Sequence, residues 1–158
     1  MPKTVTCGTA KGGDMLLATY GTFRQGEALS DYLEPLRMHG TTEVIELTGI
    51  KLFVMGMAPG AKITNDPNDK AVVELIDADI TEDQVDSVLE LLDHVEGVAQ
   101  SLYKRDFVET PKGTAVIYTK CGKVDGCIEI TDWMEWQKKG RKEKIKAMGK
   151  AGANAIYV

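Results

Sequence analysis

The sequence predicts an α+β domain built around a mixed sheet or a small barrel. Three observations lead to this prediction: β-rich segments outnumber helical ones, short turns typical of hairpins separate several of them, and one segment has clear helical periodicity. The chain has 158 residues, 43% hydrophobic and 27% charged, which is an ordinary globular balance. At this length we expect a single domain, because a chain of about 150 residues hides roughly 70% of its unfolded surface on folding.

The first apolar segment and the region after it predict a strand, a loop and a helix. Asp14–Tyr20 is a short apolar run that Gly21 interrupts, as expected of a buried strand. Glu27–Met38 has apolar residues at helical spacing, so we expect a helix there, kinked by Pro35 and ended at Gly40.

The next part of the chain is rich in residues that favour strands. Val44–Met57 predicts extended structure with a bend at Gly49. Ile63–Lys70 (ITNDPNDK) has the composition of a turn, and Ala71–Ile80 (AVVELIDADI) predicts another strand.

Thr81–Val95 is the clearest helix in the sequence. Thr81 and Gln84 form the pattern of a capping box, and Gly97 is placed to stop the helix. Its apolar positions recur at helical spacing: Val85, Val88, Leu89 and Leu92.

The last third predicts a hairpin and a tail. Leu102–Glu109 and Thr114–Lys120 are expected to be antiparallel strands joined by Pro111–Gly113. Trp133 and Trp136 precede a basic, helical tail.

Charge and composition exclude several classes of protein. The net charge is −5, which argues against a dedicated nucleic-acid binder. No apolar run approaches the roughly 20 residues of a membrane span, and the N-terminal residues lack the apolar stretch of a secretory signal. The three cysteines are odd in number and form no recognisable pattern (Cys7, Cys121 and Cys127). We therefore expect the protein to be located in the reducing cytoplasm. Neither the cysteines nor the two histidines (His39 and His94) form a metal motif.

Charge is also unevenly distributed. Glu74–Glu96 holds nine acidic residues and no Lys or Arg, whereas Lys138–Lys150 holds seven basic residues and one acid. The basic segment is consistent with a solvated terminal helix, or with contact to an anionic partner or to the acidic surface of the same chain.

The loop Tyr20-Gly21-Thr22-Phe23-Arg24-Gln25-Gly26 lies between the first predicted strand and the first predicted helix. Glycine at such a junction lets backbone N–H groups turn toward an anion. A P-loop is excluded, because Glu27 stands where that motif requires Lys. Two interpretations stay open: an ordinary connecting turn, and a main-chain cradle for a ligand.

Glu96 follows the clearest helix, four residues after Leu92 and seven after Leu89. If the helix continues that far, the carboxylate projects from the apolar face. Burial there would raise its pKa toward the range of a general acid/base. If the helix frays at His94, the carboxylate points to water. Similarly, Tyr103 can be a core ring or can offer its hydroxyl to a polar ligand.

In order and spacing, these segments resemble the gamma-glutamyl cyclotransferase-like family, including the gamma-glutamylamine cyclotransferases. The resemblance covers residues 14–136 and includes the loop at Tyr20–Gly26, Leu92-Asp93-His94-Val95-Glu96-Gly97 and Leu102-Tyr103. It also includes a valine-rich hairpin near Tyr118 and a Gly-Asp-Trp-like element at Thr131-Asp132-Trp133. Phe23 replaces the usual leucine, and Ala28-Leu29-Ser30 lacks a frequent asparagine.

The resemblance implies a small mixed β-barrel flanked by helices, with a ligand cavity at one mouth. It implies Glu96 as the catalytic acid/base, with substrate contacts from Tyr20, Gly21, Thr22, Phe23, Arg24 and Tyr103. Residues 1–136 would form the domain, and residues 137–158 a basic extension packed on it or trailing from it.

The activity implied is cyclisation of a γ-glutamyl amine or amide to 5-oxoproline with release of the amine. The substrate is a small molecule, and the reaction needs no metal or cofactor. Two alternatives stay open: a non-catalytic protein that binds a small molecule in the same cavity, and an interaction protein that uses Lys138–Lys150. The sequence gives no indication of oligomeric state.

Overall fold

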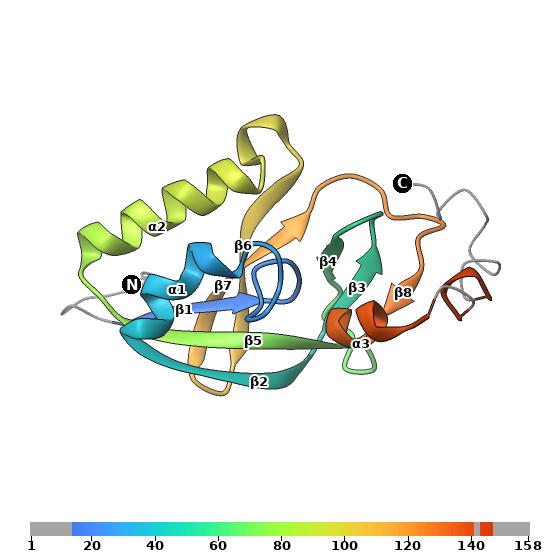
Figure 1. Ribbon diagram of the computed structural model, residues 1–158, viewed down its shortest axis with the longest axis horizontal. Coiled ribbons are helices and arrows are strands. Elements are labelled where there is room, and N and C mark those ends of the chain that lie inside the picture. The colour runs from blue at the N-terminus through green and yellow to red at the C-terminus, as the bar shows by residue number, and fades with distance from the viewer. Residues whose placement is uncertain (1–13, 141–142, 147–158) are drawn as a thin grey trace.

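The computed structural model describes residues 14–140 and 143–146, and in that part of the chain the strands form two sheets (Figure 1). The strand order is β2-β5-β1-β7-β6 in the larger sheet and β4-β3-β8 in the smaller. The strands are β1 (Asp14–Thr19), β2 (Gly40–Thr48), β3 (Ile50–Val54), β4 (Pro59–Ile63), β5 (Lys70–Asp79), β6 (Tyr103–Thr110), β7 (Gly113–Lys120) and β8 (Glu129–Ile130). The α-helices are α1 (Glu34–Met38), α2 (Glu82–Val95) and α3 (Trp133–Lys138), with 3-10 turns η1 (Ser30–Leu33) and η2 (Val98–Gln100).

Strand β1 lies in the middle of the larger sheet. It pairs antiparallel with β5, where Leu17 faces Ile76, and parallel with β7, where Leu17 faces Val116. The α+β class and the mixed pairing are therefore confirmed. A closed barrel is not found among the described residues, because β2 and β6 lie at opposite edges of an open sheet.

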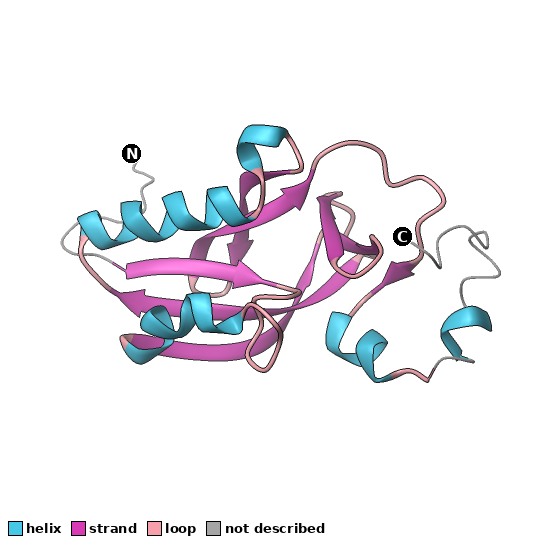
Figure 2. Ribbon diagram, turned by 45° about the horizontal axis from the view of Figure 1, so that its top comes forward, coloured by secondary structure: helices cyan, strands magenta, loops and turns pink. Residues whose placement is uncertain are grey.

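The larger sheet is covered on both faces, so its central strands are apolar on both sides. Leu17, Ile76 and Val116 belong to a core that also includes residues of α1 and α2. Their sequence neighbours Ala18, Leu75 and Ile117 point the other way, into a core shared with β3 and β4. Figure 2 shows α1 and α2 lying along the larger sheet, with the smaller sheet and α3 toward one end.

The predicted helix over Glu27–Met38 is wrong in its first half. Residues before Ser30 form turns, η1 follows, and the α-helix begins only at Glu34. Pro35 does not kink this helix; it lies in its first turn, where the missing N–H matters least. The helix ends at Met38 with His39 as its C-cap, and Gly40 is already the first residue of β2.

The remaining predicted elements agree with the structure to within a few residues. Helix α2 has both hydrogen bonds of the capping box between Thr81 and Gln84. Strands β2 and β3 are separated by Gly49 alone, as the predicted bend requires. The β6–β7 hairpin pairs as predicted, but β4 and β8 were not expected.

Some of the predictions lie outside the described residues. These include Cys7 and most of the basic segment after Gly140, of which residues 143–146 are helical. Among the helices that the structure describes, none is long and apolar enough to cross a membrane.

Candidate active site

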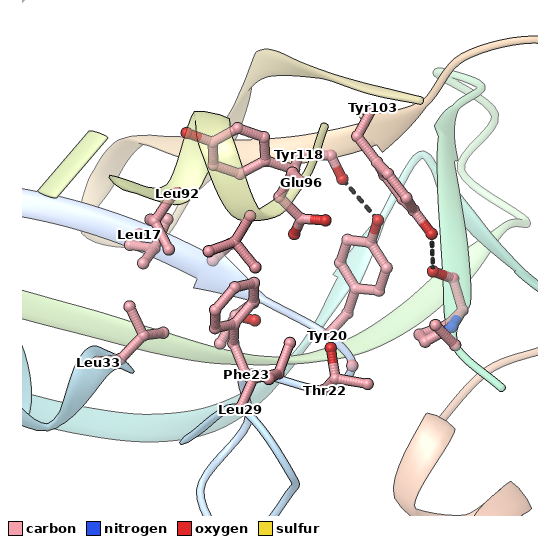
Figure 3. A pocket seen from close by; sticks show the side chains of 16 residues that line it. Leu17, Tyr20, Thr22, Phe23, Leu29, Leu33, Leu92, Glu96, Tyr103 and Tyr118 are labelled. Atoms are coloured by element: carbon pink, nitrogen blue, oxygen red, sulfur yellow. Dashed lines mark hydrogen bonds between the residues drawn. The ribbon is translucent and has the colours of Figure 1, made fainter. Parts of the chain in front are cut away.

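A cavity of about 260 Å³ opens where several elements of the larger sheet begin or end. Its walls come from the end of β1 and the loop after it, the end of α2, the start of β4, and the cavity-facing residues of β6 and β7 (Figure 3). Because β1 and β7 run parallel, the residues that follow β1 meet Tyr118 near the end of β7. The predicted site residues Tyr20, Gly21, Thr22, Phe23, Glu96 and Tyr103 all line this one cavity.

The loop after β1 is a compact turn. The Arg24 N–H donates to the Gly21 carbonyl at 2.9 Å, and the Leu29 N–H donates to the Thr22 carbonyl at 2.8 Å. Gly21 is needed for its lack of a side chain, because a Cβ there would lie 2.4 Å from Cγ of Pro59. The loop and the first residue of β4 thus pack directly against each other at the cavity wall.

Within the described residues, the N–H groups of Thr22 and Phe23 donate to no acceptor of the protein. Buried main-chain donors are nearly always paired in folded proteins. Thr22 is partly buried, Phe23 is buried, and both line the cavity, so their N–H groups are left for water or for a ligand.

Glu96 is the only charged residue among those that line the cavity in the described part of the chain. It caps the C-terminus of α2, which continues to Val95, so the alternative in which the helix frays at His94 does not hold. Gly97 ends the helix in the left-handed conformation with a φ of 69°. Figure 3 shows the carboxylate pointing into the cavity.

Burial raises the pKa of Glu96 to about 7. No donor among the described residues binds its carboxylate, so the cause is desolvation with no hydrogen bond to oppose it. Near neutral pH this group is present in both protonation states, which suits proton transfer in either direction.

Two tyrosines beside Glu96 bind the main chain of other strands. The Tyr20 hydroxyl donates to the Tyr118 carbonyl at 2.6 Å and accepts from the Ala61 N–H at 3.2 Å. The Tyr103 hydroxyl donates to the Pro59 carbonyl at 2.8 Å. Burial raises the pKa of Tyr20 well above its ordinary value, and burial followed by the charge of Glu96 raises the pKa of Tyr103 to about 12. Both hydroxyls therefore keep their protons at neutral pH.

Arg24 is the one predicted site residue that does not line the cavity. Its side chain is buried, and Nη1 binds Oδ1 of Asp132 at 2.8 Å. Asp132 also caps α3 by accepting from the Met134 N–H. The guanidinium thus connects the loop to α3.

Asp93, three residues before Glu96, does not line the cavity but binds Tyr118, which does, and it was not among the predicted site residues. It accepts hydrogen bonds from both Nε and Nη2 of Arg105, and a 2.6 Å bond from the Tyr118 hydroxyl. Burial alone would raise the pKa of Asp93, but these hydrogen bonds outweigh it and the pKa is lowered. Asp93 thereby holds the last turn of α2 against β6 and β7. Its place in the Leu92–Gly97 motif was the signal that could have found it.

Among the described residues, no group of three or more His, Cys, Asp and Glu side chains is placed to hold a metal ion.

Sequence comparison places this chain in a known family. A curated protein from Vibrio cholerae, named "Putative gamma-glutamylcyclotransferase", is 30% identical over 122 residues, which make up 76% of this chain and 96% of that protein. The chain belongs to the gamma-glutamylcyclotransferase family. No family model matches the sequence.

Solved structures share the gamma-glutamylcyclotransferase-like fold of this chain. An uncharacterised protein from Pyrococcus horikoshii has a TM-score of 0.58 at 22% identity, covering 78% of this chain and 92% of its own. The protein YtfP from Escherichia coli has a TM-score of 0.53 at 23% identity, covering 78% of this chain and all of its own. These likenesses support the α+β fold of a gamma-glutamylcyclotransferase-like domain.

Proposed function

We propose that this protein cyclises a γ-glutamyl amine or amide to 5-oxoproline and releases the amine, with Glu96 as the acid/base. The observation that carries the proposal is the position of Glu96 as the one charged residue among the cavity-lining residues described, with a pKa of about 7. Family membership supports the reaction class.

The substrate contains its own nucleophile. The α-amino nitrogen attacks the γ-carbonyl carbon, a five-membered ring closes, and the bond from that carbon to the leaving nitrogen breaks. Folding the substrate so that these atoms meet supplies a large rate factor, because the reaction is intramolecular. The cavity of about 260 Å³ is where we expect the substrate to be held in such a folded form.

Glu96 would move the proton that this reaction requires. As a carboxylate it takes a proton from the substrate ammonium, which makes the amine nucleophilic. As a carboxylic acid it gives that proton to the leaving nitrogen, and it then accepts the second proton that the ring nitrogen must lose. The released amine carries this second proton away as an ammonium ion. A pKa near 7 allows both steps without a large energetic penalty on either.

The main chain of Gly21–Phe23 would stabilise the oxyanion that forms on the γ-carbonyl oxygen. Thr22 and Phe23 line the cavity, and their N–H groups donate to no acceptor among the described residues. Fixed N–H donors stabilise developing negative charge better than water does, because they need not reorient.

Tyr20 and Tyr103 would shape the cavity and contact the substrate through their rings and hydroxyl oxygens. Since each hydroxyl donates its proton to a main-chain carbonyl, it faces a ligand as an acceptor. Arg24 is left out of the proposed substrate contacts because Asp132 binds its guanidinium.

The test is release of 5-oxoproline from a panel of γ-glutamyl amines and amides. Wild type is expected to release 5-oxoproline and the amine in equal amounts, and Glu96→Gln to release neither while staying folded. Glu90→Gln, an exposed change on the same helix, is the matched control and should keep full activity. A wild-type protein that is inert on the whole panel but binds a metabolite tightly would instead support the non-catalytic alternative.

A further inference from the structure

A buried ion pair lies beside the site but does not line the cavity. Arg37 of α1 and Glu74 of β5 are 9% and 2% exposed. They meet through two hydrogen bonds of 2.8 Å, one from Nε to Oε2 and one from Nη2 to Oε1. This is the two-pronged geometry that only an arginine can form with a carboxylate.

The same pair holds the loop that borders the cavity. Glu74 Oε1 accepts from the Gln25 N–H, and Arg37 Nη2 donates to the Phe23 carbonyl, both at 2.8 Å. Arg37 Nη1 also donates to the Ser30 carbonyl at 2.8 Å. The turn is therefore held at a carbonyl and at an N–H two residues apart.

These bonds restrict the main chain that faces the substrate. The peptide unit is planar, so fixing the Phe23 carbonyl also fixes the plane of the peptide that follows it. Together with the bond from the Arg24 N–H to the Gly21 carbonyl, this leaves the loop from Gly21 to Gln25 little freedom to rotate.

The pair is not what stability alone would select. A buried ion pair is often no more stable than apolar side chains of the same volume, because both charges lose their water. Burial alone would raise the pKa of Glu74, but the hydrogen bonds from Arg37, Gln25 and Thr42 lower it, so the carboxylate is ionised at neutral pH. The two charged groups instead make hydrogen bonds of defined geometry to the loop.

We propose that Arg37 and Glu74 are positioning residues that hold the Gly21–Phe23 main chain in the orientation that receives the oxyanion. This rests on the proposed function. Neither side chain lines the cavity, so the pair acts through the loop.

The test compares three variants with wild type. Arg37→Met/Glu74→Leu removes both charges together and leaves no unpaired ion in the core. Arg37→Lys keeps the charge but loses the two-pronged contact, and it decides the question if the double variant does not fold. Thr42→Val is the matched control, because Thr42 Oγ1 donates to Glu74 at 2.8 Å but does not contact the loop.

Two measurements are made on each variant. Amide hydrogen exchange by NMR reports the loop directly, and the Gln25 amide is expected to exchange at least tenfold faster in the double variant than in wild type or Thr42→Val. Steady-state release of 5-oxoproline is expected to show a kcat at least tenfold lower, with KM within threefold and the pH midpoint of Glu96 unchanged. For Arg37→Lys we expect a Gln25 exchange rate and a kcat between those of wild type and those of the double variant.

The outcomes separate this inference from the proposed function. Wild-type kcat, or wild-type exchange at Gln25, in a folded double variant would overturn the positioning role, and the same result in Arg37→Lys would do so if the double variant is unfolded. If wild type and Thr42→Val both release no 5-oxoproline, the proposed function fails instead. In that case the role in the reaction fails with it, and the exchange data still decide whether the pair holds the loop.

Discussion

The hydroxyl of Tyr103 donates to the carbonyl of Pro59 across 44 positions of sequence, at 2.8 Å. The bond joins the start of β6 in the larger sheet to the start of β4 in the smaller one. Pro59 also packs against Gly21, so three segments of the cavity wall depend on one another.

Tyr103→Phe removes the bond to Pro59 and keeps the ring. We expect a loss of about 1 kcal/mol of unfolding free energy, which is typical of one hydrogen bond. We also expect a higher KM, because β4 is then less firmly held at the cavity. Urea unfolding and steady-state kinetics measure the two effects. Tyr32→Phe, on a half-exposed ring, is the control and should change neither. An unchanged KM in Tyr103→Phe would exclude the Tyr103 hydroxyl from the proposed substrate contacts.

Glu96→Gln is expected to stabilise the protein at high pH while it abolishes activity. Because the pKa of Glu96 is raised to about 7 in the folded state, the folded protein binds the proton more tightly than the unfolded chain does. The stability that this tighter proton binding gives the folded state is fully present below about pH 4.5 and is lost as the pH rises through about 7. Urea unfolding should therefore show the variant about 3 kcal/mol more stable than wild type at pH 8, and about equally stable at pH 4. Glu90→Gln should show no such difference, and a pH-independent gain would contradict the burial of Glu96.

The pH dependence of the reaction should report the same ionisation. In the proposed reaction Glu96 accepts the ammonium proton as a carboxylate, so kcat/KM should rise about tenfold per pH unit below its pKa and level off above about pH 7. Initial rates between pH 5.5 and 8.5 test this. A flat profile across that range would exclude Glu96 as the base.

Gly21→Ala should lower both stability and activity. The new Cβ would lie 2.4 Å from Cγ of Pro59, so the loop or β4 must move, at a cost of about 1–3 kcal/mol. Removing the Pro59 ring should restore most of the lost stability and activity. The double variant Gly21→Ala/Pro59→Ala is therefore expected to be closer to wild type in both properties than Gly21→Ala is. Thermal unfolding and kcat/KM of the four proteins in this cycle measure the coupling. Additive effects would show that the clash is not the cause.

Arg24→Met tests whether Arg24 contacts the substrate. If its role is the bond to Asp132, the variant should lose about 2 kcal/mol of unfolding free energy and keep KM within twofold of wild type. Denaturant unfolding and steady-state kinetics separate the two effects. A large rise in KM with little loss of stability would return Arg24 to the substrate contacts that the sequence predicts.

The parts of the fold that could be predicted from sequence are those with local signals. Helix α2 has a capping box, an apolar stripe and a terminal glycine, and all three are short-range features. The segment from Glu27 to Met38 has an apolar spacing that fits a helix, but long-range contacts decide its shape. Arg37 binds Glu74 and the Phe23 carbonyl, and these partners are far away in sequence or lie in the loop. Strand β4 starts with Pro59 and Gly60, which are poor strand formers, and pairing with β3 overrides that preference.

The candidate site likewise contains residues that local sequence signals mark and residues that they do not. The predicted residues that line the cavity occur in short motifs, and the resemblance of these motifs, in their order, to a known family predicted that they meet. Pro59, which also lines the cavity, lies in none of these motifs. The residues that support them are not marked locally. Glu74 lies in a strand with several acids, and nothing in the sequence distinguishes it from the exposed Asp79 of the same strand. Its burial and its partner Arg37 depend on how the helix and sheet pack.

The position of β1 at the centre of the larger sheet constrains when the protein can become functional during its synthesis. One neighbour, β5, begins at Lys70, and the other, β7, begins only at Gly113. A nascent chain on the ribosome therefore carries a central strand with one unsatisfied edge until the residues from Gly113 onward have emerged. Any fragment released before Tyr118 would lack one wall of the cavity, so premature termination should yield aggregation-prone pieces that bind no ligand.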